Sequence, residues 1–314
     1  MAEANATGEK PAKRIEDGVK VINTNFTSLV TGLCGAQGLK YDKSGKLFMV
    51  TPFREVEGGG VSGQVITVDV ADAKTEVVSS PSVEGFDGMP SGILFDQDDV
   101  MWIADMRLGI LKANKDGSVE QVAKEDRDGN AMQGCHDCVM DKDGNKWFTA
   151  PASHIPPAAP MTLQQICGSE HGSVYCLTKS GEIIRALTGL RFPNSLIMKR
   201  VEGGPEVLLV TEMVTKCIKS YEIKGPGCLE NETVWAVMPG ENFGGPAGLV
   251  QDAEGKVFVA NWGEGTIEIF STEGGQSQSR LRCPFSHPAS LLFNESGDLY
   301  VTDHVDGALW KTKL

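Results

Sequence analysis

The stretch MQGCHDCVMD (132–141) holds the residue types that could bind a metal or carry redox chemistry. Cys135 and Cys138 have the C-x-x-C spacing of zinc and dithiol sites, and His136 lies between them. A tetrahedral zinc site would need two further ligands at a suitable spacing, and the remaining cysteines are scattered singly along the chain. The pattern therefore favours two small buried cysteines, on a strand whose alternation points Cys135 and Asp137 away from the face that carries His136.

Composition and charge limit the kinds of partner. Acidic residues outnumber basic ones by 42 to 29 among 314 residues, and the net charge of −13 argues against nucleic acids and anionic membranes. The N-terminal residues contain no apolar signal-peptide core, and no run approaches the roughly 18 apolar residues of a membrane span. We expect a cytoplasmic monomer with free thiols, in which residues 1–20 form a polar tail and residues 21–314 a single domain.

An internal repeat is the strongest signal for the fold. Six segments share one plan: an apolar β-rich run, a turn rich in Asp, Asn and Gly, and a second β-rich run. They span residues 41–52, 95–106, 140–151, 198–213, 251–262 and 293–304. The second run has an aromatic residue or Leu at its second position: Phe48, Trp102, Trp147, Leu209, Phe258 and Tyr300. These residues lie 42 to 62 residues apart, about the length of a propeller blade. The repeat predicts an all-β fold, a six-bladed β-propeller with four-stranded antiparallel blades around a central channel.

The same alignment predicts which residues surround the channel. Equivalent positions of the innermost strands form a ring in a propeller, and here they are Gln37, Ser91, His136, Asn194, Ala247 and Ala289. A second set follows each hairpin: Thr51, Asp105, Ala150, Glu212, Asn261 and Asp303. One residue later come Met106, Pro151, Met213, Trp262 and His304. His136 and His304 are thus expected at one channel mouth, which favours a functional role for the pair.

Several motifs are similar to those of one enzyme family. ADMRLGIL (104–111), MQGCHDC (132–138), FPN (192–194), YEIKGPG (221–227), VANWG (259–263), RCPF (282–285) and VTDH (301–304) resemble the diisopropyl fluorophosphatase type of the SMP-30/gluconolactonase family. The resemblance runs from about residue 30 to the C-terminus. It implies a six-bladed propeller with a catalytic calcium held by a Glu, two Asn and an Asp, the last also proposed as the nucleophile.

The residues at those calcium positions differ in this chain. They are Gln37, His136, Asn194 and Ala247, so that only Asn194 matches. Val250 and Leu292 stand where the family's second, structural calcium has an Asp and a His. Calcium takes about six to eight oxygen ligands, and carboxylates offset its dehydration, so each missing carboxylate weakens binding strongly. We expect a degenerate calcium site and no cofactor, with calcium bound through altered ligands as the alternative.

The residues around the channel predict acid–base chemistry on a small organic molecule. His136 would be the central acid–base group, and His304 a second proton carrier oriented by Asp303 or Glu212. Substrate would be held by hydrogen bonds from Gln37, Ser91 and Asn194. The apolar walls implied by the resemblance are Met106, Phe192 and Trp262.

The resulting hypothesis is a diverged, metal-independent enzyme. One alternative is a calcium-dependent hydrolase of phosphotriesters, fluorophosphates or lactones with altered ligands. Another is a non-catalytic pseudoenzyme that binds a small molecule in the same pocket, and a third is a scaffold that uses the propeller rim for protein contacts. No phosphate-binding Gly loop, Ser–His–Asp order or nucleotide fingerprint identifies the substrate.

Overall fold

The computed structural model describes residues 18–57, 60–153, 166–199 and 203–314. Four of its sheets have four strands each. They consist of β3 (Gln37–Tyr41), β4 (Leu47–Thr51), β7 (Gln64–Asp69) and β8 (Lys74–Ser79); β11 (Pro90–Phe95), β12 (Met101–Asp105), β13 (Gly109–Ala113) and β14 (Val119–Ala123); β15 (Cys138–Met140), β16 (Lys146–Ala150), β17 (Gly172–Leu177) and β18 (Ile183–Leu190); and β27 (Pro288–Phe293), β28 (Asp298–Asp303), β29 (Ala308–Lys313) and β2 (Phe26–Val30).

A nine-stranded sheet contains two further runs of four consecutive strands. These are β19 (Pro193–Lys199), β20 (Val207–Glu212), β21 (Cys217–Gly225) and β22 (Cys228–Val237), followed by β23 (Gly245–Gln251), β24 (Val257–Trp262), β25 (Thr266–Ser271) and β26 (Gly274–Arg282). The outer strands β22 and β26 meet in parallel at one residue pair, Ala236 and Gly275, and β1 (Lys20–Ile22) is added beside β26. The sheets are therefore not the six separate ones that the repeat predicts, because these two long outer strands touch edge to edge.

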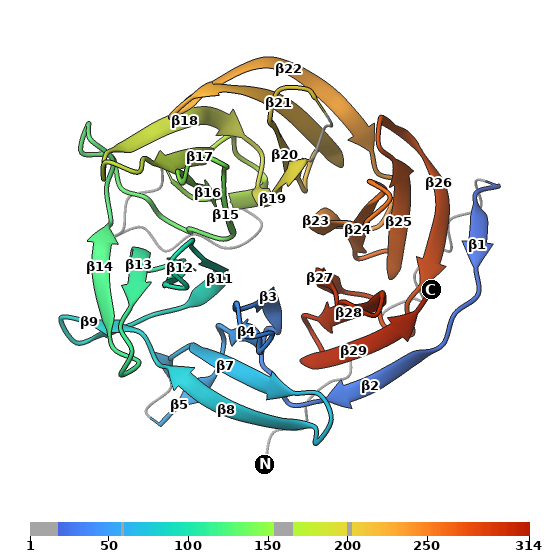
Figure 1. Cartoon of the computed structure of the whole chain (residues 1–314), viewed down its shortest axis with the longest axis horizontal. Helices are drawn as coiled ribbons and strands as arrows, with labels where there is room; N and C mark the ends of the chain where they lie inside the picture. Colours follow the sequence, from blue (N-terminus) through green and yellow to red (C-terminus); the bar gives the residue numbers. More distant parts are fainter. Residues whose placement is uncertain (1–17, 58–59, 154–165, 200–202) are drawn as a thin grey trace.

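The sheets are arranged in a ring, which makes the fold an all-β propeller (Figure 1). The strands that begin each run, β3, β11, β15, β19, β23 and β27, lie nearest the centre. Two short ribbons, β5 (Glu55–Val56) with β6 (Gly60–Val61) and β9 (Ser82–Val83) with β10 (Phe86–Asp87), lie outside these sheets. In the described part of the chain, no helix is long and apolar enough to cross a membrane.

Local turn chemistry accounts for the inner hairpins. Each of the six repeated segments lies at an antiparallel pair of inner strands. In the first, the Asp42 carboxylate accepts hydrogen bonds from the backbone N–H groups of Ser44 and Lys46, at 2.9 and 2.8 Å. The same arrangement recurs at Asp96, Asp141 and Asp252. Asp suits this position because its short side chain can accept hydrogen bonds from the N–H groups of its own turn.

The ring closes through strands from opposite ends of the chain. β2 pairs antiparallel with β29, with Phe26 opposite Thr312, so an N-terminal strand completes the sheet formed by the last three strands. The apolar core lies between neighbouring runs of strands: each buried cluster combines side chains from two consecutive runs, such as Leu94 with Phe148 and Tyr175. Each run is thus held in place by its two neighbours, and this fixes the inner strands around the centre.

Candidate functional site

A pocket of about 340 Å³ lies where the inner strands begin. Its lining includes the complete predicted ring, Gln37, Ser91, His136, Asn194, Ala247 and Ala289. The apolar residues Met106, Phe192 and Trp262 line it too, as does His304. Eight of the ten residues predicted to act on a substrate therefore share one cavity, and Asp303 and Glu212 do not line it.

Irregular strand pairing lets consecutive residues face this pocket. The inner strands change register beside the ring positions, between Gln37 and Lys40, Pro90 and Gly92, Pro193 and Leu196, Pro246 and Leu249, and Pro288 and Leu291. Such bulges re-aim side chains that regular alternation would turn away. As a result the pocket is lined by pairs of neighbours: Gln37 with Gly38, His136 with Asp137, Asn194 with Ser195, Ala247 with Gly248, and Ala289 with Ser290.

The prediction that Asp137 points away from His136 is therefore wrong. β15 begins only at Cys138, and before it the His136 N–H donates to the Thr149 carbonyl at 2.8 Å while the Thr149 N–H donates to the Asp137 carbonyl at 3.1 Å. Both bonds go to the same partner residue, so the alternation of a strand does not apply here, and both side chains reach the pocket.

The C-x-x-C cysteines are buried in the core, as predicted. Cys135 and Cys138 are free thiols within the apolar cluster between two sheets. Burial raises the pKa of both thiols above the usual value, so neither is a thiolate at neutral pH. Among the described residues, no group of three or more His, Cys, Asp or Glu side chains is arranged to hold a metal ion.

The His136 ring is held in a defined tautomer. Its Nδ1 lies 3.0 Å from the Asn194 carbonyl oxygen, which also accepts a bond from the Thr149 hydroxyl at 2.8 Å. A carbonyl oxygen can only accept, so Nδ1 carries the proton, and the lone pair of the neutral ring is on Nε2. Burial lowers the pKa of His136, and the Asp137 charge and the bond to Asn194 oppose this only in part. His136 is thus a neutral imidazole whose Nε2 can accept a proton or a hydrogen bond.

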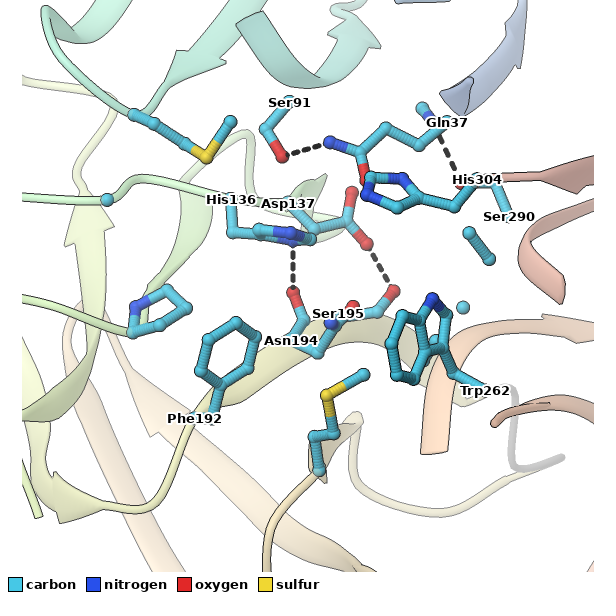
Figure 2. A pocket seen from close by; sticks show the side chains of 18 of the residues that line it. Gln37, Ser91, His136, Asp137, Phe192, Asn194, Ser195, Trp262, Ser290 and His304 are labelled. Atoms are coloured by element: carbon cyan, nitrogen blue, oxygen red, sulfur yellow. Dashed lines mark hydrogen bonds between the residues drawn. The ribbon is translucent and has the colours of Figure 1, made fainter. Parts of the chain in front are cut away.

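Asp137 is a site residue that the sequence analysis missed. Its carboxylate accepts hydrogen bonds from the backbone N–H of Cys138 at 2.8 Å, the N–H of Leu196 at 3.4 Å, and the Ser195 hydroxyl. Figure 2 shows the carboxylate turned toward Ser195, with the rings of His136, His304, Phe192 and Trp262 nearby. The sequence signal for Asp137 was its position next to His136 in the C-H-D-C motif. The assumption of regular strand alternation led to the wrong prediction that it points away from the pocket.

His304 is a neutral group at physiological pH. Burial, together with the proximity of His136 and His287, lowers its pKa to about 4. The ring stacks edge-on against Phe53 with centroids 5.6 Å apart. Because its pKa is this low, His304 is a neutral imidazole rather than an imidazolium at neutral pH.

The two carboxylates predicted to orient His304 are engaged elsewhere. Glu212, at the end of β20, accepts from the Thr215 hydroxyl at 2.6 Å and the Arg191 N–H at 3.2 Å. Asp303, at the end of β28, accepts from the Asp306 N–H at 3.3 Å. Each residue ends a strand and binds the following turn, so the next side chain in the chain, Met213 or His304, is the one that faces the pocket. Among the described residues, no hydrogen bond joins either carboxylate to the His304 ring.

The polar residues of the ring form part of a shared network. The Gln37 side-chain N–H donates to the Ser91 hydroxyl at 2.6 Å, which leaves the Gln37 carbonyl oxygen as an acceptor. Gly38 follows with a φ of 66°, and its N–H donates to the Ser290 hydroxyl at 2.8 Å. A Cβ on Gly38 would come within 3.0 Å of the Ser91 carbonyl, so only glycine fits this close approach of two inner strands.

Aromatic and apolar side chains form most of the remaining wall. Phe53, Phe243 and Ile166 line the pocket and were not predicted, whereas Met213 lies at the channel as the repeat alignment predicts. Phe243 packs edge-on against Trp262 at 6.1 Å. Phe192 has a φ of 57°, a left-handed conformation that is costly for a side chain of this size and often marks a functional site. Its ring stands edge-on to His136, with centroids 6.2 Å apart.

The lining residues do not suit the calcium that the family resemblance implies. Ala247 contributes no oxygen, and His136 contributes a nitrogen, whereas calcium prefers about six to eight oxygens that include carboxylates. Gln37 and Asn194 can each offer one amide oxygen. Asp137, the one carboxylate among the described lining residues, already has both of its oxygens hydrogen-bonded to the protein. The donor set therefore does not fit a hard divalent cation.

Comparison with known proteins confirms the resemblance seen in the motifs. The family model described as the SMP-30/gluconolactonase/LRE-like region matches residues 37–304. A diisopropyl-fluorophosphatase from Loligo vulgaris is 40% identical over 296 residues, which cover 93% of each chain. A strictosidine synthase-like 3 protein from Arabidopsis thaliana is 28% identical over 168 residues, 53% of this chain and 42% of that protein. A gluconolactonase structure from Xanthomonas campestris superposes with a TM-score of 0.72 at 18% identity, covering 98% of this chain and 96% of the other, and has the same fold.

Proposed function

The chain belongs to the SMP-30/gluconolactonase/LRE-like family, and from this premise we propose that its central pocket takes a small, largely apolar organic molecule. His136 acts on that molecule as an acid–base group, without the calcium that the family resemblance implies. We also propose that the nine-stranded sheet functions as two blades, which makes six blades around the pocket.

The observation that carries the proposal is the fixed tautomer of His136. The bond from Nδ1 to the Asn194 carbonyl directs the ring, so that Nε2 is the nitrogen available for a ligand. A base of this kind can take a proton from an O–H, N–H or activated C–H group, which leaves an imidazolium with protons on both nitrogens. The carboxylate of Asp137 lies next to this ring and stabilises the positive charge that then forms.

The composition of the wall supports a small organic ligand. Ligand pockets are usually apolar with a few convergent polar groups, and volumes start at about 300 Å³. Here Phe192, Trp262 and Met106 provide apolar surface, while Gln37 and Asn194 can hold polar atoms of the ligand.

A calcium-dependent hydrolase is the second candidate, favoured by the 40% identity to a protein named diisopropyl-fluorophosphatase. The third is a binding protein that uses the same pocket without turnover. Chelation separates the hydrolase from the proposal, and loss of turnover with retained binding separates an enzyme from a binder.

The experiment is a turnover screen in excess EDTA with lactones, carboxylic esters and diisopropyl fluorophosphate. His136→Gln should abolish any turnover found and leave KM within about a factor of three, because Gln keeps the volume but cannot take the proton. His171→Gln, a histidine outside the pocket lining, is the matched control. Turnover that stops in EDTA and returns with calcium would replace the proposal by the hydrolase.

A positive control for calcium is available in the same chain. The triple variant Gln37→Glu, His136→Asn, Ala247→Asp adds two carboxylates and removes the imidazole. It should bind calcium measurably by calorimetry when the wild-type protein does not. Calcium binding of equal strength by both proteins would contradict the assignment of these residues to the metal positions.

A further inference from the structure

Building on the proposed function, we infer that the pocket selects an organic cation, namely a protonated amine carried on an apolar body. Asp137 is the residue that recognises the positive charge. The same pocket could take a neutral ester or lactone, so the inference narrows the class of ligand and can fail while the proposed function stands.

The Asp137 carboxylate is fixed in place but has no positively charged hydrogen-bond partner. Its hydrogen bonds come from the backbone N–H groups of Cys138 and Leu196 and from the Ser195 hydroxyl, all uncharged donors. They hold the carboxylate in position, and because they carry no charge they do not offset its negative charge. Asp137 is only partly buried and lines the cavity, so a ligand can reach it.

No other described residue of the lining compensates the charge of Asp137. None of the described residues that line the pocket is a lysine or an arginine. The two pocket histidines are neutral, because burial lowers the pKa of both His136 and His304. A cationic ligand would therefore supply the charge that the pocket lacks, whereas an anionic one would add to it.

The residues that line the pocket with Asp137 include hydrogen-bond acceptors. Two of the lining atoms are acceptors of known orientation: Nε2 of His136, and the carbonyl oxygen of Gln37, which has one of its two amide N–H groups bonded to Ser91. An ammonium group has three N–H donors and matches such a set. The rings of Phe192 and Trp262 in the same wall would add to the attraction for a cation positioned over a ring face.

The test uses three probes of one shape that differ in charge: 2-phenylethylammonium, 2-phenylethanol and 3-phenylpropanoate. Calorimetry on the full-length protein should show the ammonium binding about ten- to a hundredfold tighter than the alcohol, the range expected for a charged hydrogen bond. The carboxylate should be the weakest of the three. Calcium is included as a fourth, competing probe.

Asp137→Asn should remove the preference and leave affinity for the alcohol nearly unchanged, since Asn keeps the shape but not the charge. Asp143→Asn removes the same charge from an exposed turn of the same sheet and should preserve the ranking. If Asp137→Asn does not fold, the relative affinities of the three probes for the wild-type protein still test the inference.

The remaining outcomes of the binding experiment contradict either the preference for a cation or the proposal that the pocket binds a small organic molecule. Equal binding of the alcohol and the ammonium, or a preference that survives in Asp137→Asn, overturns the inference and leaves the proposed function standing. Displacement of the ammonium by calcium overturns it too, because the carboxylate would then serve a metal. Failure of all three organic probes to bind overturns both the inference and the proposed pocket ligand.

Discussion

Replacing His304 by Gln should change how the stability of the folded protein depends on pH. The folded-state pKa of His304 is about 4, against an ordinary value of 6.5. Between these values the unfolded chain binds a proton that the folded protein does not. The contribution of this group to stability is therefore fully present above pH 6.5 and is lost as the pH falls through the window down to about 4.

The magnitude follows from the two pKa values. At about pH 4.5 the difference between folded and unfolded protonation corresponds to roughly 2.5 kcal/mol of lost stability, at about 1.4 kcal/mol per pKa unit. His304 lines a cavity that water can enter, and this screens the effect. We therefore expect a loss of about 1–2 kcal/mol between neutral pH and pH 4.5.

The neighbouring residue Asp303 masks this loss in the wild-type protein. Burial raises the pKa of Asp303 to about 6, so the folded state binds a proton that the unfolded chain takes up only near 3.8. Its contribution has the opposite sign: stability is gained as the pH falls through that window. The two effects largely cancel, and the pH dependence of the wild-type protein alone does not reveal either of them.

The assay is urea unfolding of wild-type and His304→Gln protein near neutral pH and at about pH 4.5. The variant should gain about 1–2 kcal/mol relative to the wild type on acidification, because it lacks the group that resists protonation. His171→Gln, which lies outside the pocket lining, is the control and should run parallel to the wild type. Parallel curves for His304→Gln as well would refute the reasoning that the pocket histidines are neutral because they are desolvated.

Three further predictions concern the metal, the core and the approach of the inner strands. Excess calcium should leave the unfolding temperature of the wild-type protein equal to that in EDTA. A functional calcium site, at a free calcium concentration a hundred times its Kd, would instead add about 2.7 kcal/mol to the free energy of unfolding. Arg280→Met should cost about 3–5 kcal/mol in urea unfolding, because it strands the buried Glu268 carboxylate that now lies 3.0 Å from the guanidinium, and adding Glu268→Leu should recover most of the loss. Gly92→Ala should cost about 1–3 kcal/mol because its Cβ would lie 2.7 Å from Cα of Asp137, while Gly225→Ala, which meets open space, should be near neutral; equal losses would show that the contact does not matter.

The repeated hairpins and the ring around the pocket could be predicted from the sequence because both depend on local chemistry. An Asp that accepts hydrogen bonds from the N–H groups of its own turn, as at Asp42 and Asp141, favours a tight turn between two β-rich runs. Six copies of one hairpin also make their equivalent positions meet at one axis. Gln37, His136 and Asn194 therefore fall in one cavity, as predicted.

The joining of sheets and the closure of the ring were decided by contacts between distant segments. Nothing in the residues of β2 indicates that they pair with β29, almost at the other end of the chain. The single pair between Ala236 and Gly275 likewise arises only because two outer strands, each long, come to lie edge to edge. Such pairings are a property of the assembled ring.

The directions of individual side chains at the pocket were also settled only by the tertiary structure. A one-residue irregularity turns a strand side chain to the opposite face, and the inner strands have such irregularities beside the ring. At Asp137 the irregularity lies just before β15, where His136 and Asp137 both pair with Thr149, and it brings Asp137 to the pocket. Glu212 and Asp303 end their strands and bind their own turns. Residue types and spacing thus predicted which ring positions line the pocket, and local strand pairing determined that Asp137, rather than Glu212 or Asp303, is the carboxylate that lines it.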